Sequence, residues 1–278
     1  MSRRTQDLLF TLFGDYMRTH GGEIWVGSLI ELMDCLGVSA QAVRSTLSRM
    51  ARKSWLKTRQ AGRNSYYSLT PKSIAVLEEG SQRIFHPRKD PWDGQWHILV
   101  YSIPEKQRHL RVRLRQRLVW MGFGLLNQAT WIAPRDLRQE VEALLDQLGI
   151  RPYVETFRAE HLGFSSDQEI VGRCWNLNAL NQSYADFIDH HEREYQSLLE
   201  HPERRTLCGD FTRRFNLVHD YRSLPYVDPN LPAELLPEGW LGDKAISLFQ
   251  SYHDLLTDTA EAFVSSVLAK SPENHKAQ

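Results

Sequence analysis

The sequence predicts an α+β protein of three parts: an N-terminal winged helix-turn-helix, a central ferredoxin-like β-α-β-β-α-β domain and a mostly α-helical C-terminal domain. Three observations predict this fold. Short amphipathic segments precede a hairpin pattern, strand and helix patterns then alternate, and long helical patterns fill the last part of the 278 residues. We place the domains at residues 1–88, 92–163 and 166–278.

Two helices are predicted at the N-terminus. The first has apolar residues at helical spacing over residues 8–16 and ends at a pair of glycines. In the second, Ser28 and Glu31 have the spacing of a capping box, and the apolar stripe stops at Gly37.

A third helix is predicted to follow after a short turn. Ser39 is a suitable N-cap, and Val43, Leu47 and Met50 form one apolar face. Two short helices joined in this way are a helix-turn-helix pattern.

A hairpin is predicted directly after the third helix. Residues 56–60 and 65–70 have strand character around a turn at residues 61–64. A hairpin in this position is a wing. The stretch from residue 39 to residue 70 contains seven basic residues and no aspartate or glutamate.

The missing acids predict contact with a polyanion, because phosphates would repel a carboxylate. A solvated basic surface is the alternative for one such helix alone, but helix-turn-helix, wing and lack of acids together favour DNA. Arginine, glutamine and serine can hydrogen-bond base edges in the major groove, and basic residues on a wing can reach phosphates. The predicted base contacts are Gln41, Arg44, Ser45, Ser48 and Arg49, and the predicted phosphate contacts are Arg52, Lys57, Arg59 and Arg63.

Composition supports this division of the chain. Residues 1–117 contain 20 Lys/Arg and 10 Asp/Glu, which leaves 14 and 24 for residues 118–278, so a net charge of zero hides a basic first part. No apolar run reaches the roughly 18 residues of a membrane helix. We therefore expect a cytoplasmic protein without membrane contact or cofactor.

The remaining patterns outline the central and C-terminal domains. A helix is predicted over residues 71–85 and a linker over residues 86–94. Strand, helix, hairpin, helix and strand patterns then follow in the ferredoxin-like order. The C-terminal helices are interrupted by a proline-rich segment at residues 224–242.

With these residues placed, the sequence resembles the PaaX family of transcriptional repressors of phenylacetic acid degradation operons. The resemblance runs over nearly the whole chain. Its main stretches are residues 9–33, 41–56, 62–70, 96–105, 173–181 and 219–242.

The resemblance implies a winged-helix repressor that binds operator DNA as a homodimer and is released by the effector phenylacetyl-CoA. The central part resembles the small Cas2-like domain of CRISPR nucleases. Two departures from the family pattern are Ser54, where glycine is expected, and residues 224–226, which are less aromatic than expected.

A CoA thioester needs cationic groups for its phosphates and an aromatic partner for its adenine. The predicted effector residues are therefore Arg213, Arg214, Tyr221, Arg222, Tyr226 and Trp240. Each of them singly is as well explained by packing between the last helices.

Three other functions are weighed. A metal-dependent nuclease needs a carboxylate at the end of the first central strand, where only Glu105 is found after Ser102, so we expect no enzyme. A CoA hydrolase lacks its usual motifs, such as GxSxG. A repressor of the same fold that responds to another acyl-CoA, to another ligand or to none remains an alternative.

Metal and disulfide sites are not predicted. His190 and His191 lack HExxH spacing, and neighbouring helical positions point in different directions, so we expect them to face solvent or pack. Cys35, Cys174 and Cys208 lie far apart in sequence and are expected to be buried free thiols.

Overall fold

The computed structural model describes residues 4–18, 20–85 and 90–273, and these form two compact units. The first unit comprises Met1–His86, Phe187–Arg222 and Lys244–Gln278, and the second comprises Pro87–Asp186 and Ser223–Asp243. Part of the linker predicted at residues 86–94, namely residues 86–89, falls outside the described residues. Each unit is described by itself.

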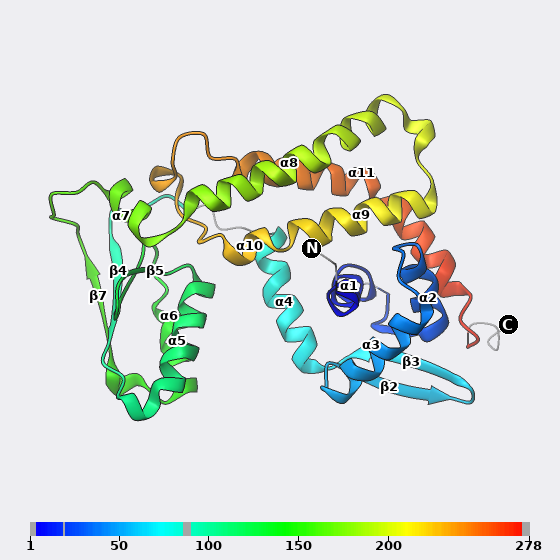
Figure 1. Ribbon diagram of the computed structural model, residues 1–278, viewed down its shortest axis with the longest axis horizontal. Coiled ribbons are helices and arrows are strands. Elements are labelled where there is room, and N and C mark those ends of the chain that lie inside the picture. Colours follow the sequence, from blue (N-terminus) through cyan, green and yellow to red (C-terminus); the bar gives the residue numbers. More distant parts are fainter. Residues whose placement is uncertain (1–3, 19, 86–89, 274–278) are drawn as a thin grey trace. The chain divides into compact units, whose positions relative to one another are not determined.

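The first unit begins with the elements of the predicted helix-turn-helix and hairpin (Figure 1). Its three strands form an antiparallel sheet in the order β1-β3-β2. The N-terminal elements are α1 (Thr5–Leu12), the π-helix η1 (Phe13–Met17), β1 (Glu23–Trp25), α2 (Val26–Asp34), α3 (Ala40–Arg52), β2 (Leu56–Ala61), β3 (Asn64–Leu69) and α4 (Pro71–Phe85).

The C-terminal helices complete the core of this unit. One cluster of buried side chains joins Leu12 of α1 and Leu47 of α3 to Phe211, Phe215 and Val264. The unit therefore combines segments from both ends of the chain around a single apolar core. The later elements are α8 (Leu177–Glu200), whose first part belongs to the second unit, η4 (Pro202–Arg204), α9 (Leu207–Tyr221) and α11 (Gly242–Ala269).

The capping box predicted for the second helix is wrong. Helix α2 begins at Val26, with Trp25 as an N-cap that makes no side-chain bond, so Ser28 lies inside the helix. Ser28 is only 1% exposed, and its hydroxyl donates to the carbonyl oxygen of Val267 at 3.0 Å. The serine is there because it satisfies a carbonyl near the end of α11, which no local pattern reveals.

The second unit has the predicted β-α-β-β-α-β order. Its four strands form an antiparallel sheet in the order β5-β6-β4-β7. The elements are β4 (Trp96–Tyr101), η2 (Glu105–Gln107), α5 (Arg108–Met121), β5 (Gly124–Asn127), β6 (Thr130–Ala133), α6 (Arg138–Leu148), η3 (Arg151–Tyr153), β7 (Val154–Ala159), α7 (Asp167–Cys174), α10 (Leu224–Val227) and η5 (Ala233–Leu235).

Both faces of this sheet are covered. Side chains alternate along a strand, so Leu99 of β4 packs with Leu144 of α6 on one face. On the other face Trp96 packs with Val171 of α7 and Leu235 of η5. The two antiparallel sheets and the many helices confirm the predicted α+β class. Among the described residues, no helix has the length and hydropathy needed to cross a membrane.

The cysteines are free thiols, as predicted, but none of them is fully buried. Cys35 and Cys174 are partly exposed and Cys208 is exposed. Cys35, at the end of α2, and Cys208, in the first turn of α9, bring their sulfur atoms within 3.0 Å. Burial and the contact with Cys208 raise the pKa of Cys35 to about 12.

Candidate nucleic-acid interface

Helix α3 presents the predicted polar face to solvent. The Ser39 hydroxyl accepts a hydrogen bond from the backbone N–H of Ala42 at 3.3 Å, which confirms the predicted N-cap. Val43, Leu47 and Met50 are fully buried, so this stripe fixes the rotation of the helix. The exposed residues of the opposite face are Gln41, Arg44, Ser45, Ser48, Arg49 and Arg52.

The six side chains of this face differ in how strongly the protein holds them. Arg49 donates to the hydroxyl of Thr46 at 2.9 Å, and Ser45 donates to the carbonyl of Ala42 at 3.1 Å. Arg44 and Arg52 have no hydrogen bond or ion pair with any residue that the structure describes. These two guanidinium groups are therefore available to an external anion.

The hairpin β2–β3 places further positive charge beside this helix. Gly62 has φ +62° in the turn between the strands, a conformation that glycine adopts without strain. Lys57 on β2 and Arg63 in the turn are exposed. Both side chains are therefore open to solvent on the hairpin.

Arg59 differs from the other basic residues of the hairpin. Its guanidinium contacts the carboxylate of Glu23 on β1 at 2.6 Å and that of Glu273 at 2.8 Å, and it lies 4.4 Å from the centre of the Tyr66 ring. Hydrogen bonds to Glu273 and Glu23 raise the pKa of Arg59 above its usual value. Two carboxylates compensate this cation, so a phosphate would have to compete with them.

The segment after α11 forms a strap along the N-terminal elements, here defined as residues 270–273. Lys270 Nζ contacts Glu31 Oε1 of α2 at 2.6 Å, and the hydroxyls of Ser271 and Tyr66 are 3.3 Å apart. Glu273 then reaches Arg59. Sequence reasoning missed the strap because its contacts join residues more than 200 positions apart.

Comparison with known proteins identifies the family of this chain. Residues 4–73 match the model described as PaaX-like protein, residues 89–171 match the PaaX protein central Cas2-like domain, and residues 175–266 match the PaaX-like protein C-terminal domain. The transcriptional repressor PaaX of Escherichia coli is 32% identical over 261 residues, which is 93% of this chain and 82% of that protein. The chain belongs to the PaaX family.

A solved structure shares the fold of this PaaX-family chain. An uncharacterized protein from Mycobacterium tuberculosis aligns with a TM-score of 0.60 over 92% of this chain and 96% of its own length. At 21% identity the likeness concerns the fold alone. The family model of the central domain is described as Cas2-like. Glu105, the carboxylate considered above for a nuclease site, forms an ion pair with Arg111 at 2.8 Å.

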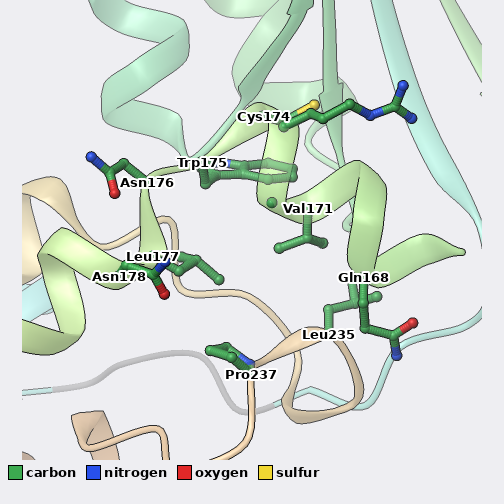
Figure 2. Close-up of a pocket in the computed structure, with 11 residues that line it drawn as sticks. Gln168, Val171, Cys174, Trp175, Asn176, Leu177, Asn178, Leu235 and Pro237 are labelled. Atoms are coloured by element: carbon green, nitrogen blue, oxygen red, sulfur yellow. The ribbon is translucent and has the colours of Figure 1, made fainter.

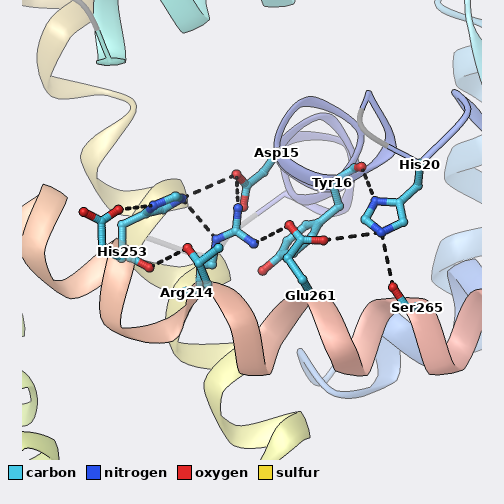
Figure 3. Close-up of polar contacts among 9 residues, drawn as sticks. Asp15, Tyr16, His20, Arg214, His253, Glu261 and Ser265 are labelled. Carbon is cyan, nitrogen blue, oxygen red and sulfur yellow. Dashed lines mark hydrogen bonds and ion pairs between the residues drawn. The ribbon is translucent and has the colours of Figure 1, made fainter.

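Arg214 lies at the centre of a buried polar cluster (Figure 3). It is 4% exposed, and its guanidinium donates to Asp15 at 3.1 Å, to Glu261 at 2.8 Å and to His253 at 3.1 Å. Burial disfavours its charge, but the attraction of Asp15 and Glu261 outweighs this and raises the pKa of Arg214. The cluster joins η1, α9 and α11, so Arg214 has a structural partner for every part of its guanidinium.

The other predicted effector residues lie in both units. In the first unit, Arg213 contacts Glu194 at 2.9 Å and Asp210 at 3.2 Å. Tyr221 is 1% exposed and stacks on Phe249, while Arg222 is partly exposed. In the second unit, Tyr226 packs 4.7 Å from Trp120 and Trp240 packs 5.5 Å from Tyr184, measured between ring centres.

A pocket that sequence reasoning did not single out lies in the second unit (Figure 2). It has a volume of about 310 Å³ and lies where α7 ends and α8 begins, beside Leu235 and Pro237. Arg173, Trp175 and the amides Asn176 and Asn178 are among its lining residues. The break at Trp175 and Asn176 between two helical patterns was the sequence signal for it.

Proposed function

We propose that this PaaX-family protein is a transcriptional repressor in which α2 and α3 form a helix-turn-helix and β2–β3 forms its wing. The single observation that carries this proposal is the exposed face of α3. It presents arginine, glutamine and serine, has no carboxylate, and includes two guanidinium groups without a partner among the described residues. The E. coli relative is named a transcriptional repressor.

The exposed polar and basic residues fall into two groups in this proposal, those that contact bases and those that contact phosphates. Gln41, Arg44 and Ser48 point from α3 toward base edges in the major groove, with Ser45 and Arg49 beside them. Three other exposed cations contact phosphates, which position the protein without reading sequence; they are Arg52, Lys57 and Arg63. Arg59 can contact a phosphate only after its ion pairs with Glu23 and Glu273 have broken.

The protein acts as a homodimer in this proposal, because two recognition helices bound to one operator are held about 34 Å apart, one turn of DNA. Its effector is phenylacetyl-CoA, which acts by binding the DNA-incompetent form more tightly than the competent one. The pocket of about 310 Å³ in the second unit supports an effector site there, because this volume is within the range of small-molecule sites. Arg173 would supply a cation and Trp175 an aromatic wall.

The thiol in that pocket suits binding rather than chemistry. Burial raises the pKa of Cys174 to about 11, so the group stays protonated near neutral pH. A thiolate, not a thiol, attacks a thioester. An acyl-CoA bound beside Cys174 would therefore remain intact and could dissociate unchanged.

Fluorescence anisotropy with a labelled operator from a phenylacetate catabolic promoter tests the proposal, with random DNA as competitor. The titration is repeated with phenylacetyl-CoA, free phenylacetate and CoA. We expect specific binding that only the thioester releases. If a dimer makes about 6 to 10 phosphate contacts, affinity should fall roughly 10³- to 10⁵-fold between 50 and 200 mM salt.

The arms of this experiment separate the parts of the proposal. A flat salt response contradicts DNA binding through the basic face. Specific binding that no ligand releases keeps the winged helix and rejects phenylacetyl-CoA as effector. Release by another acyl-CoA, but not by this one, identifies a repressor of the same fold with a different ligand.

A further inference from the structure

Three metal-ligating side chains converge on the surface of the first unit. His190 and His191 lie on α8 and Asp220 lies on α9. One ligand atom from each residue lies within 4.8 Å of the other two. The rings of the two histidines are 4.6 Å apart between centres, with their planes at 85° to each other.

His191 is a buried side chain with an unsatisfied nitrogen. It is 3% exposed, and its ring packs against Phe187 at 4.7 Å and Tyr252 at 6.4 Å between centres. Its Nε2 atom is buried and accepts or donates no hydrogen bond within the described part of the chain. Leaving a buried polar atom unpaired is costly, and such atoms in native proteins often mark a missing water or ion.

The distance from His191 Nε2 to the carboxylate of Asp220 fits two ligands of one metal ion better than a hydrogen bond. His191 Nε2 lies 3.4 Å from Asp220 Oδ2, which is too long for a good hydrogen bond. Two ligands bonded to a tetrahedral Zn²⁺ at about 2.0–2.1 Å are roughly 3.3–3.4 Å apart. His191 and Asp220 therefore already have the separation of two zinc ligands, and the exposed His190 ring needs only to turn inward to supply a third.

We propose that His190, His191 and Asp220 form a binding site for a divalent transition metal, with Zn²⁺ as the preferred ion. Two imidazoles and one carboxylate suit zinc better than calcium or magnesium, which prefer oxygen ligands alone. Three protein ligands leave a fourth position for water. The third ligand, Asp220, comes from another helix, so the spacing of the two histidines in the sequence does not reveal the site.

The position of the site suggests that a bound metal would hold α8 and α9 together. The chain passes from the second unit into the first between Asp186 and Phe187, and it leaves again between Arg222 and Ser223. The site lies within a few residues of both passages, on α8 and α9. A bound ion would therefore fasten the two helices to each other where they leave the first unit.

Isothermal titration of the full-length, metal-stripped protein with ZnCl₂ tests the proposal, together with the visible spectrum of the Co²⁺ form. We expect one Zn²⁺ per chain and Co²⁺ absorption of the tetrahedral kind. His190→Ala and Asp220→Asn should each weaken zinc binding by at least about 10-fold. These residues are used because they are more exposed than His191, so the variants should fold, which circular dichroism checks.

Two control variants separate this site from other zinc ligands on the chain. His201→Ala removes an exposed histidine that lies 3.2 Å from Glu203, and Cys208→Ser removes one of the two adjacent thiols. Both should bind zinc as the parent chain does. Less than one Zn²⁺ per chain, or equal affinity in the parent and both site variants, overturns the proposal. Operator binding is not the readout, so the result stands apart from the repressor proposal.

Discussion

Arginine serves opposite purposes on two helices of the same unit. On α3, Arg44 and Arg52 are exposed and have no ionic partner among the described residues. On α9, Arg213 and Arg214 are held by carboxylates from three other elements, and Arg214 is almost fully buried. The first pair suits an external anion, whereas the second fixes helices to one another.

The difference lies in the acids that the fold supplies. All four arginines lie on amphipathic helices, so the local sequence does not distinguish them. Asp15 and Glu261 reach Arg214 from positions far away in sequence, whereas no carboxylate of the described residues forms an ion pair with Arg44 or Arg52 of α3. Tertiary contacts therefore decide which guanidinium groups remain for DNA. Four predictions test this comparison.

The largest expected effect is on stability. Arg214→Leu leaves the buried carboxylate of Asp15 without its cation, and breaking a buried pair in this way costs about 3–5 kcal/mol of unfolding free energy. Urea denaturation followed by circular dichroism measures it. Arg44→Leu is the matched control and should change the unfolding free energy by no more than about 0.5 kcal/mol. Similar losses in the two variants would mean that the helices do not differ as described.

The second effect is on sequence discrimination. Arg44→Ala removes a guanidinium that we assign to a base edge, so operator binding should lose about 1–3 kcal/mol while binding to random DNA changes less. Competition anisotropy with both DNAs measures the ratio. An equal loss of affinity for operator and random DNA would mean that Arg44 contacts a phosphate and not a base.

The third effect is smaller and has no sequence preference. Arg63→Ala removes a cation at the tip of the hairpin, so operator and random DNA should weaken by a similar factor. The slope of log affinity against log salt should fall by about 1. A loss confined to the operator would show that the wing reads bases.

Much of the fold could be predicted from the spacing of residues along the sequence, whereas many contacts around the candidate nucleic-acid interface could not. The cap at Ser39, the buried stripe of α3 and the order of strands and helices along the second unit depend on short-range spacing and were predicted. Ser28 was misplaced because its hydroxyl serves a carbonyl 239 residues away. The same limit hid the pairing of Arg59 with Glu273 and the contact between Cys35 and Cys208, which join residues 214 and 173 positions apart.

The smallest expected effect concerns the strap, because Arg59 of the hairpin is held by carboxylates, as the arginines of α9 are. Glu273→Gln removes one of the two carboxylates that hold Arg59, so more of its positive charge becomes available to phosphate. Random DNA should bind a few-fold more tightly at low salt, and the gain should vanish as salt rises. Glu203→Gln removes the same charge from an exposed acid that lies 3.2 Å from His201, so it controls for net charge. A gain of equal size in both variants would mean that Arg59 is already open to DNA and that the strap does not restrain the wing.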